Sequence, residues 1–223
     1  MTKERLKSPR ARLFVALDLP EDVRTRLAEW QRGALAELEA LRPLRPEALH
    51  VTLCFLGYHP ERAIERIAEI VTGIEPRVVK ARFEPDPVPI PSRRPRLFAV
   101  DAPSDGAVAL QAELSDRLEA GRFYEPEKRP FWSHVTVARV RSEKASRKGG
   151  RRGRPRVVER APGPLPEELM EPFGAVRVAL YRSNLRPSGA EYVRLAGFDL
   201  PPQGRGRARG ATKEIDLGRA RSD

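Results

Sequence analysis

The sequence predicts an α+β fold of two similar lobes, each a mostly antiparallel sheet with outer helices, with a cleft between the lobes. The main observation is a repeat at an offset of 84 residues, in which Arg12-Leu13-Phe14 recurs as Arg96-Leu97-Phe98 and His50-Val51-Thr52 recurs as His134-Val135-Thr136. A second observation is that strand-like and helical segments follow in the same order in both halves, without a glycine-rich phosphate-binding loop. We therefore expect a pseudo-symmetric duplication in which the two histidines occupy equivalent positions.

The first half is expected to run strand, helix, strand and helix. Residues 21–41 carry apolar side chains at spacings of three and four, which predicts a helix with one buried face. Pro20 and the two acidic residues after it are typical of a helix start, because proline suits the first turn and carboxylates favour the helix N-terminus. The strand bearing the first histidine follows, then a helix at about residues 60–72 and a strand at about 78–84.

The second half repeats this order and adds further strands. Ser104 is a good helix cap, and the apolar residues from Ala107 to Leu118 have helical spacing. The strand bearing the second histidine comes next, and we expect two more strands at about residues 174–183 and 190–199.

The net charge of +11 is concentrated in three segments. Residues 1–10 carry a net +3, residues 139–160 a net +8 and residues 201–223 a net +3, which leaves about −3 for the remaining body. We expect a basic disordered N-terminus at 1–10, a catalytic domain at 11–200 with a flexible basic loop at about 141–160, and a basic disordered tail at 201–223. Such segments either contact a polyanion through its phosphates or act as solvated tails.

The composition excludes several classes of protein. The single cysteine, Cys54, excludes an internal disulfide framework and fits a reducing cytoplasm. No apolar stretch is long enough to span a bilayer, and the basic N-terminus has no apolar run typical of a secretory signal. One cysteine and three histidines leave little for a metal cage, so we expect no metal and no cofactor. We expect a cytoplasmic monomer.

The two His-x-Thr tripeptides are the strongest chemical signal. Side chains alternate along a strand, so His50 and Thr52 are expected on one face, with Val51, Leu53 and Phe55 on the other. The same alternation pairs His134 with Thr136 and extends the polar face of the first strand to Cys54, at the floor of the cleft. A polar pair on an apolar strand requires either a solvent-filled cleft or hydrogen-bond partners.

Two imidazoles and two hydroxyls suit the opening of a cyclic phosphodiester. The reaction needs a base to activate water and an acid to protonate the departing alkoxide, and histidine can do both near neutral pH. Threonine hydroxyls can donate to the nonbridging phosphate oxygens, where negative charge accumulates. A serine-type triad is not indicated, because no motif positions a carboxylate for it.

At these residues the sequence resembles the two-histidine phosphoesterase superfamily and, within it, the bacterial RNA 2′,3′-cyclic phosphodiesterases, historically called 2′-5′ RNA ligases. The resemblance spans about residues 11–200, and its strings are Arg12-Leu13-Phe14-Val15-Ala16-Leu17, Leu49-His50-Val51-Thr52-Leu53-Cys54-Phe55-Leu56-Gly57, Ser133-His134-Val135-Thr136-Val137-Ala138-Arg139 and Leu180-Tyr181-Arg182-Ser183-Asn184-Leu185. It implies a bilobal fold and hydrolysis of 2′,3′-cyclic phosphate ends to 2′-phosphomonoesters, with long RNA or small cyclic nucleotides as substrates.

The resemblance also implies roles for single residues. His134 would be the proton acceptor that activates water, and His50 the proton donor to the leaving 3′-oxygen, although which imidazole is acid and which is base stays open. Thr52, Thr136 and Arg139 would bind the substrate phosphate. Strand alternation, however, places Arg139 on the face opposite His134 unless the strand bends.

Other aromatic and histidine residues receive a structural interpretation. Phe14, Phe98 and Trp132 are candidates for stacking on a terminal base, but their apolar character favours the core. His59 has no threonine partner and precedes Pro60, which predicts a surface turn.

Three alternatives remain. The chain could be a non-catalytic RNA-binding protein, although binding alone does not require both imidazoles. It could be a two-histidine enzyme for another cyclic phosphate, such as one on an ADP-ribose derivative, or for 2′-5′ RNA ligation. A metallonuclease is the least favoured class, because no carboxylate cluster has the spacing of metal ligands.

Overall fold

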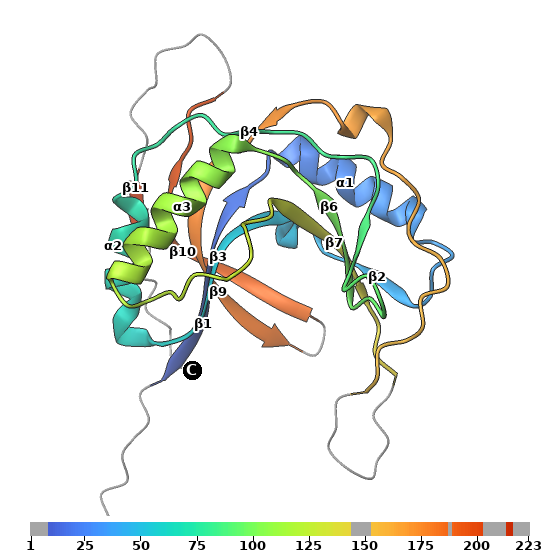
Figure 1. The fold of residues 1–223 in the computed structure, drawn as a ribbon, viewed down its shortest axis with the longest axis horizontal. Coiled ribbons are helices and arrows are strands. Elements are labelled where there is room, and N and C mark those ends of the chain that lie inside the picture. Colours follow the sequence, from blue (N-terminus) through green and yellow to red (C-terminus); the bar gives the residue numbers. More distant parts are fainter. Residues whose placement is uncertain (1–8, 144–152, 187–188, 203–212, 216–223) are drawn as a thin grey trace, which may run out of the picture.

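The computed structural model describes residues 9–143, 153–186, 189–202 and 213–215 of the chain (Figure 1). Short 3₁₀ turns connect some of its elements. Its helices and strands are, in chain order, β1 (Arg10–Asp18), α1 (Glu21–Ala34), β2 (Leu41–Pro43), β3 (His50–Pro60), α2 (Ile64–Thr72), β4 (Lys80–Ala81), β5 (Val88–Ile90), β6 (Leu97–Asp101), α3 (Asp105–Ala120), β7 (His134–Val140), β8 (Phe173–Gly174), β9 (Arg177–Arg186), β10 (Gly189–Asp199) and β11 (Lys213–Ile215).

The main sheet has the strand order β11-β10-β9-β1-β3-β7-β6-β5, with β2 also paired to β7, and its pairs are antiparallel. In each half the first strand pairs with the strand that begins at the histidine: β1 with β3, and β6 with β7. The two histidine strands meet at the middle of the sheet through the pair Val51–Val135. The predicted α+β class with antiparallel sheets is confirmed, whereas descent from a duplicated unit stays a prediction.

Each long helix covers the histidine strand of the other half. Helix α1 packs on β7, and α3 packs on β3, so the halves share one hydrophobic core. Figure 1 shows α3 and α1 at opposite sides of the molecule. The predicted cap of α3 is confirmed, since the Ala107 amide donates to the Ser104 hydroxyl at 3.1 Å, and the apolar face from Ala107 to Leu118 is buried.

The predicted helix 21–41 begins where expected but ends seven residues early, at Ala34. The chain continues in turns, in which Leu38 donates to the Leu35 carbonyl and Leu41 to the Leu38 carbonyl. Leu35 and Leu41 are nevertheless buried in the core. The apolar spacing therefore predicted correctly which side chains are buried. It did not predict the backbone structure at Leu41, which pairs as a strand with Val140 of β7.

The other predicted elements are found with shifted bounds. The helix at 60–72 consists of a 3₁₀ turn, Glu61–Ala63, followed by α2. The strands expected at 174–183 and 190–199 are β9 and β10. Of the strand expected at 78–84, only β4 forms, because its partner β8 is itself two residues long.

The basic appendages lie partly outside the described residues, including 1–8, 144–152 and much of the tail. The described ends of the loop 141–160 are paired: Glu143 donates to the Arg154 carbonyl at 2.8 Å, and Arg156 donates to that of Arg141 at 2.9 Å. The expectation of a tail without structure is wrong at 213–215, because β11 adds to β10, whose edge would otherwise leave backbone groups unpaired. Within the described ranges, no helix has the length and apolar character needed to cross a membrane.

Candidate active site

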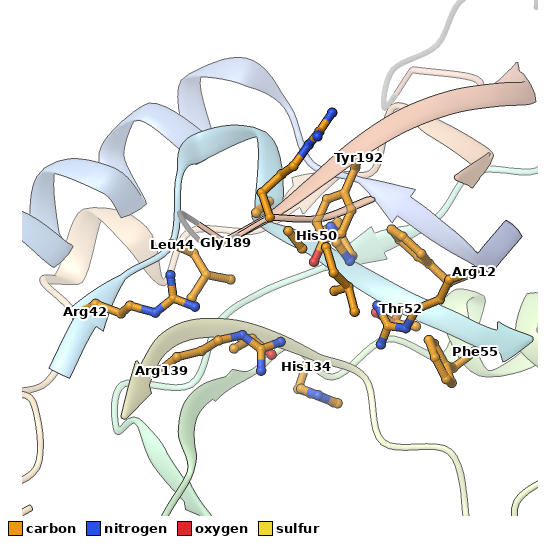
Figure 2. Close-up of a pocket in the computed structure, with 16 residues that line it drawn as sticks. Arg12, Arg42, Leu44, His50, Thr52, Phe55, His134, Arg139, Gly189 and Tyr192 are labelled. Atoms are coloured by element: carbon orange, nitrogen blue, oxygen red, sulfur yellow. The ribbon is translucent and has the colours of Figure 1, made fainter. Parts of the chain in front are cut away.

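The side chains of the two His-x-Thr motifs line one pocket of about 320 Å³ (Figure 2). His50 and Thr52 come from β3, and His134 and Thr136 come from β7. Because β3 and β7 are antiparallel and meet at Val51–Val135, the register continued by one residue brings each histidine toward the threonine of the other strand. The structure thus brings together the four residues that the sequence singled out.

A matching β-bulge in each histidine strand decides what else reaches the pocket. In the β1–β3 pairing Leu53 has no register partner in β1, and in the β6–β7 pairing Val137 has no register partner in β6. Each bulge lies one residue after the threonine, at equivalent positions of the two halves. An extra residue in one strand reverses the facing of the residues that follow it.

These bulges correct two predictions that rested on simple alternation. Cys54, expected at the cleft floor, is buried in the core, and Phe55, expected inside, is exposed and lines the pocket. In β7 the same reversal buries Ala138 and brings Arg139 into the pocket, beside His134 and Thr136. The implied phosphate-binding position of Arg139 is therefore geometrically available, although strand alternation placed it on the opposite face.

A glutamine side chain from each long helix contacts a histidine strand at or beside its bulge. Buried Gln31 of α1 donates its amide hydrogen to the backbone carbonyl of Val137, the bulged residue of β7. The Gln111 side chain of α3 is hydrogen-bonded to Cys54, next to the bulge of β3. Burial without a strong charge partner raises the pKa of Cys54 to about 12, so this thiol stays protonated at neutral pH.

His134 is held by its neighbour Trp132 in two ways. Its Nδ1 lies 2.7 Å from the Trp132 carbonyl, which can only accept, so Nδ1 carries the hydrogen and Nε2 presents a lone pair. The Trp132 ring stacks on the imidazole with a centroid distance of 4.0 Å, and its indole N–H donates to Asp101. Burial lowers the pKa of His134, against the opposing effects of the Trp132 carbonyl, Asp101 and Glu127.

His50 lies among aromatic rings. Phe14 stacks on its imidazole at a centroid distance of 5.0 Å, and Tyr192 meets it edge-on at 5.4 Å. Burial, the nearby His134 and the Arg139 guanidinium together lower the pKa of His50 to about 4. In the free protein, His50 is therefore neutral at pH 7.

The residues opposite the histidines complete a parallel between the halves. In the strand register, Asp18 of β1 lies opposite His50, and Asp101 of β6 lies opposite His134. Asp101 binds the Trp132 indole, and Asp18 accepts from the Tyr181 hydroxyl, which lies 2.7 Å from Oδ1. In each half an aspartate anchors the polar edge of an aromatic ring that lies stacked beside the histidine.

The pocket is strongly positive. Among its described lining residues are four arginines, Arg12, Arg42, Arg139 and Arg186, and none of them is an aspartate or glutamate. Sequence reasoning missed all but Arg139, as well as Phe55 and Tyr192. The repeated Arg-Leu-Phe string marked Arg12 as unusual, but nothing in the sequence showed that residues of β2, β9 and β10 would meet at the histidines.

The other aromatic and histidine residues considered from the sequence lie partly in the core and partly at the surface. Phe98 is buried in the core as predicted, and Phe14 is buried while also touching the pocket. Trp132, expected in the core, is 37% exposed because its ring covers the outer face of His134. His59 lies at the end of β3 rather than in a turn, and its Nε2 is 3.0 Å from the Leu56 carbonyl.

In the described part of the chain, no three His, Cys, Asp or Glu side chains gather as metal ligands. Metal independence stays a prediction, because it concerns the pocket with substrate bound. The imidazoles, hydroxyls and guanidinium groups of the pocket are those expected around a phosphodiester anion.

Comparison with known proteins agrees with this chemistry. A family model described as LigT-like phosphoesterase matches residues 17–86, which include the first histidine motif. A Thermus thermophilus protein named RNA 2′,3′-cyclic phosphodiesterase is 32% identical over 215 residues, which cover 89% of this chain and 96% of the relative. A relative of the same name from Methanocaldococcus jannaschii is 25% identical over 184 residues, covering 81% of this chain and 96% of the relative.

Solved structures show the same fold. A crystal structure of a Thermus thermophilus protein superposes with a TM-score of 0.68 at 28% identity, covering 86% of this chain and all of the other. Escherichia coli LigT complexed with 3′-AMP superposes with a TM-score of 0.63 at 24% identity, covering 86% of this chain and 99% of LigT. The extent and identity of the first Thermus match, together with the family model, lead to one conclusion. The chain belongs to the RNA 2′,3′-cyclic phosphodiesterase family of LigT-like phosphoesterases.

Proposed function

We propose that this protein hydrolyses 2′,3′-cyclic phosphate ends of RNA to 2′-phosphomonoesters without a metal ion, with His50 and His134 as the acid–base pair. The observation that carries the proposal is the convergence of two His-x-Thr motifs, from two adjacent strands, on one arginine-lined pocket. The names of the relatives support RNA with a cyclic phosphate end as the substrate. Small cyclic nucleotides share the reacting group and are expected substrates too.

His134 is the proposed base. Its Nδ1–H is occupied by the Trp132 carbonyl, so the lone pair of Nε2 is available to take a proton from water. The hydroxide so formed attacks phosphorus and forms the new P–O bond while the bond from phosphorus to the 3′-oxygen breaks. His50 gives its proton to the departing 3′-oxygen, which leaves the phosphate on the 2′-oxygen.

His50 must be protonated to act as the acid, although its pKa in the free protein is about 4. A bound phosphodiester anion favours the imidazolium form and raises this pKa. The anion also pairs with Arg139, whose charge lowers the His50 pKa in the free protein. Binding of substrate therefore prepares the acid, while the hydroxyls of Thr52 and Thr136 and the Arg139 guanidinium stabilise the charge on the nonbridging oxygens.

The test uses an oligoribonucleotide that ends in a 2′,3′-cyclic phosphate, incubated with protein in EDTA and followed by mass spectrometry and phosphorus NMR. Turnover to the 2′-monoester should be unchanged by EDTA and should fall by about 10²–10⁴ in His50→Ala and in His134→Ala. His59→Ala is the matched control, because this third histidine lies outside the pocket. An ADP-ribose cyclic phosphate and a 2′-5′ ligation reaction serve as comparison substrates.

Activity that survives in both pocket variants would exclude the histidine pair. Tight, salt-sensitive RNA binding without any product would identify the chain as a non-catalytic RNA-binding protein instead.

A sulfur substitution separates the acid from the base. When sulfur replaces the bridging 3′-oxygen of the cyclic end, the thiolate leaves without needing a proton. His50→Ala should therefore regain most of its lost rate on this substrate, and His134→Ala should not. Rescue of His134→Ala alone would reverse the two roles.

A further inference from the structure

A second hollow, of about 400 Å³, adjoins the active-site pocket at the outer end of β1, β3 and β9. The two share Arg12, Leu185 and Arg186 in their walls, so they lie next to each other. Beyond the shared wall the hollow adds Arg10 and Tyr58. For a polymer whose end lies at the histidines, this hollow is the neighbouring surface depression on the β1–β9 side.

The hollow is basic. Arg10 and Arg12 lie two residues apart in β1, with the buried Ala11 between them, so they share the solvent-facing side of the strand. Arg182 and Arg186 of β9 add two more positive charges. Arg182 forms a salt bridge with Glu61 at 3.1 Å, and Arg186 forms one with Glu191 at 3.3 Å, so these two charges are partly neutralised. No described lining residue of the hollow is itself acidic, which favours an anionic occupant.

Exposed aromatic rings alternate with these charges. Phe55, in the wall of the active-site pocket, is 44% exposed, and Tyr58, three residues further along β3, is 54% exposed. The Arg12 guanidinium lies over the Phe55 ring, 4.5 Å from its centroid, and Arg10 donates to the Tyr58 carbonyl. Figure 2 draws Arg12 and Phe55 side by side at the pocket. Cations along a groove with aromatic rings for stacking are the features that bind single-stranded nucleic acid.

We propose that the nucleotides immediately 5′ of the cyclic phosphate lie along this hollow, with their phosphates at Arg10 and Arg12 and a base stacked on Tyr58. This inference rests on the proposed function and adds to it that the protein prefers RNA strands to cyclic mononucleotides. The preference arises on the β1–β3 side of the pocket. In the chain, the described start of the basic loop, at Arg141, follows β7 rather than β1 or β3.

The experiment compares kcat/KM for adenosine 2′,3′-cyclic phosphate with that for a hexaribonucleotide ending in the same group. The wild-type protein should favour the hexamer. Tyr58→Ala should lower kcat/KM for the hexamer about tenfold, the loss expected for one base–aromatic stack. Tyr58→Phe, which keeps the ring, should restore it, and every variant should hydrolyse the mononucleotide at the wild-type rate.

Arg10→Ala tests the charge separately. It should weaken hexamer binding and make the slope of log K against log salt shallower by about 0.7, the contribution of one phosphate contact on a single strand. Arg32→Ala is the matched control, because it removes one exposed arginine of α1 that lines neither hollow.

The outcomes separate this inference from the function beneath it. If neither substrate is hydrolysed, the proposed function fails. If both are hydrolysed with no length preference, and the Tyr58 and Arg10 variants match wild type on the hexamer, the function stands and the strand path is wrong. Equal losses on hexamer and mononucleotide would also overturn the path, since they would show a general structural effect.

Discussion

At the scale of single residues, the two histidines are equivalent in sequence but differ in surroundings. His134 has its Nδ1–H committed to a backbone carbonyl and its ring covered by Trp132. His50 contacts the rings of Phe14 and Tyr192, and its burial together with the nearby His134 and Arg139 lowers its pKa. A fixed tautomer suits a base, whereas a low pKa that an anion can raise suits an acid that becomes charged only with substrate bound.

These surroundings predict the pH dependence. The proposed mechanism needs one protonated and one neutral imidazole, so kcat/KM should be bell-shaped, falling at low pH when both are charged and at high pH when both are neutral. Because the pKa values of both free histidines are lowered, the alkaline fall of kcat/KM should lie below about pH 6.5.

The profile of kcat should be displaced to higher pH than that of kcat/KM, because bound phosphate raises both pKa values. Rates measured from pH 4 to 9 on a cyclic mononucleotide check this. A monotonic rise through the neutral range would count against the pair.

At the scale of elements, the bulges decide which side chains reach the pocket. Without the bulge at Val137, alternation would turn Arg139 toward the face opposite His134. The carbonyl of Val137 is bound by Gln31, which belongs to the helix of the other half. Helix α1 thus contacts the bulge of β7 through a specific hydrogen bond as well as through apolar packing.

Gln31→Leu should therefore disturb Arg139. Loss of the amide leaves a buried carbonyl unpaired, which should lower the free energy of unfolding by about 1–3 kcal/mol. It should also raise KM for the cyclic mononucleotide in the same direction as Arg139→Ala.

A double-mutant cycle checks the linkage between the two residues. If Gln31 acts through Arg139, the double variant should bind substrate no worse than Arg139→Ala alone. Gln111→Leu is the matched control, because it removes a glutamine of α3 whose side chain contacts Cys54 of β3 instead. Additive losses in the cycle would show that Gln31 affects the site by another route.

At the scale of the whole molecule, a body with a small negative charge carries basic segments and a basic cleft. The segment 144–152 contains five lysines and arginines and no acidic residue. The backbone pairs at 141–143 and 154–156 bring its two ends together. Removing 144–152 therefore leaves this paired stem in place.

Deletion of 144–152 should weaken RNA binding at low salt, because each lost phosphate contact makes the salt slope shallower by about 0.7. Hydrolysis of a cyclic mononucleotide should be unaffected, since the described pocket wall does not include the loop stem. Filter binding at several salt concentrations and mononucleotide kinetics provide the two measurements. A collapse of mononucleotide turnover would instead place the loop in the active site.

The sequence alone determined the α+β class, the order of the helices and of the longer strands, and the four motif residues. Local information was sufficient there: apolar spacing reports burial even where the helix of residues 21–41 ends early, and the repeated His-x-Thr string identifies equivalent strands. The same local rule of alternation failed for Cys54, Phe55 and Arg139. An extra residue in a strand is defined only by the partner strand that it faces.

Only the tertiary structure decided the composition of the pocket. Arg12, Arg42 and Arg186 reach the histidines from strands far apart in the sequence, and their approach depends on how β1, β2 and β9 pair. The packing of each long helix on the histidine strand of the other half is likewise decided by long-range contacts. This packing allows Gln31 to contact the bulge of β7. The sequence determined the candidate reacting groups, because they belong to a local motif. Their electrostatic surroundings were decided by strand pairing, because charge acts through space rather than along the chain.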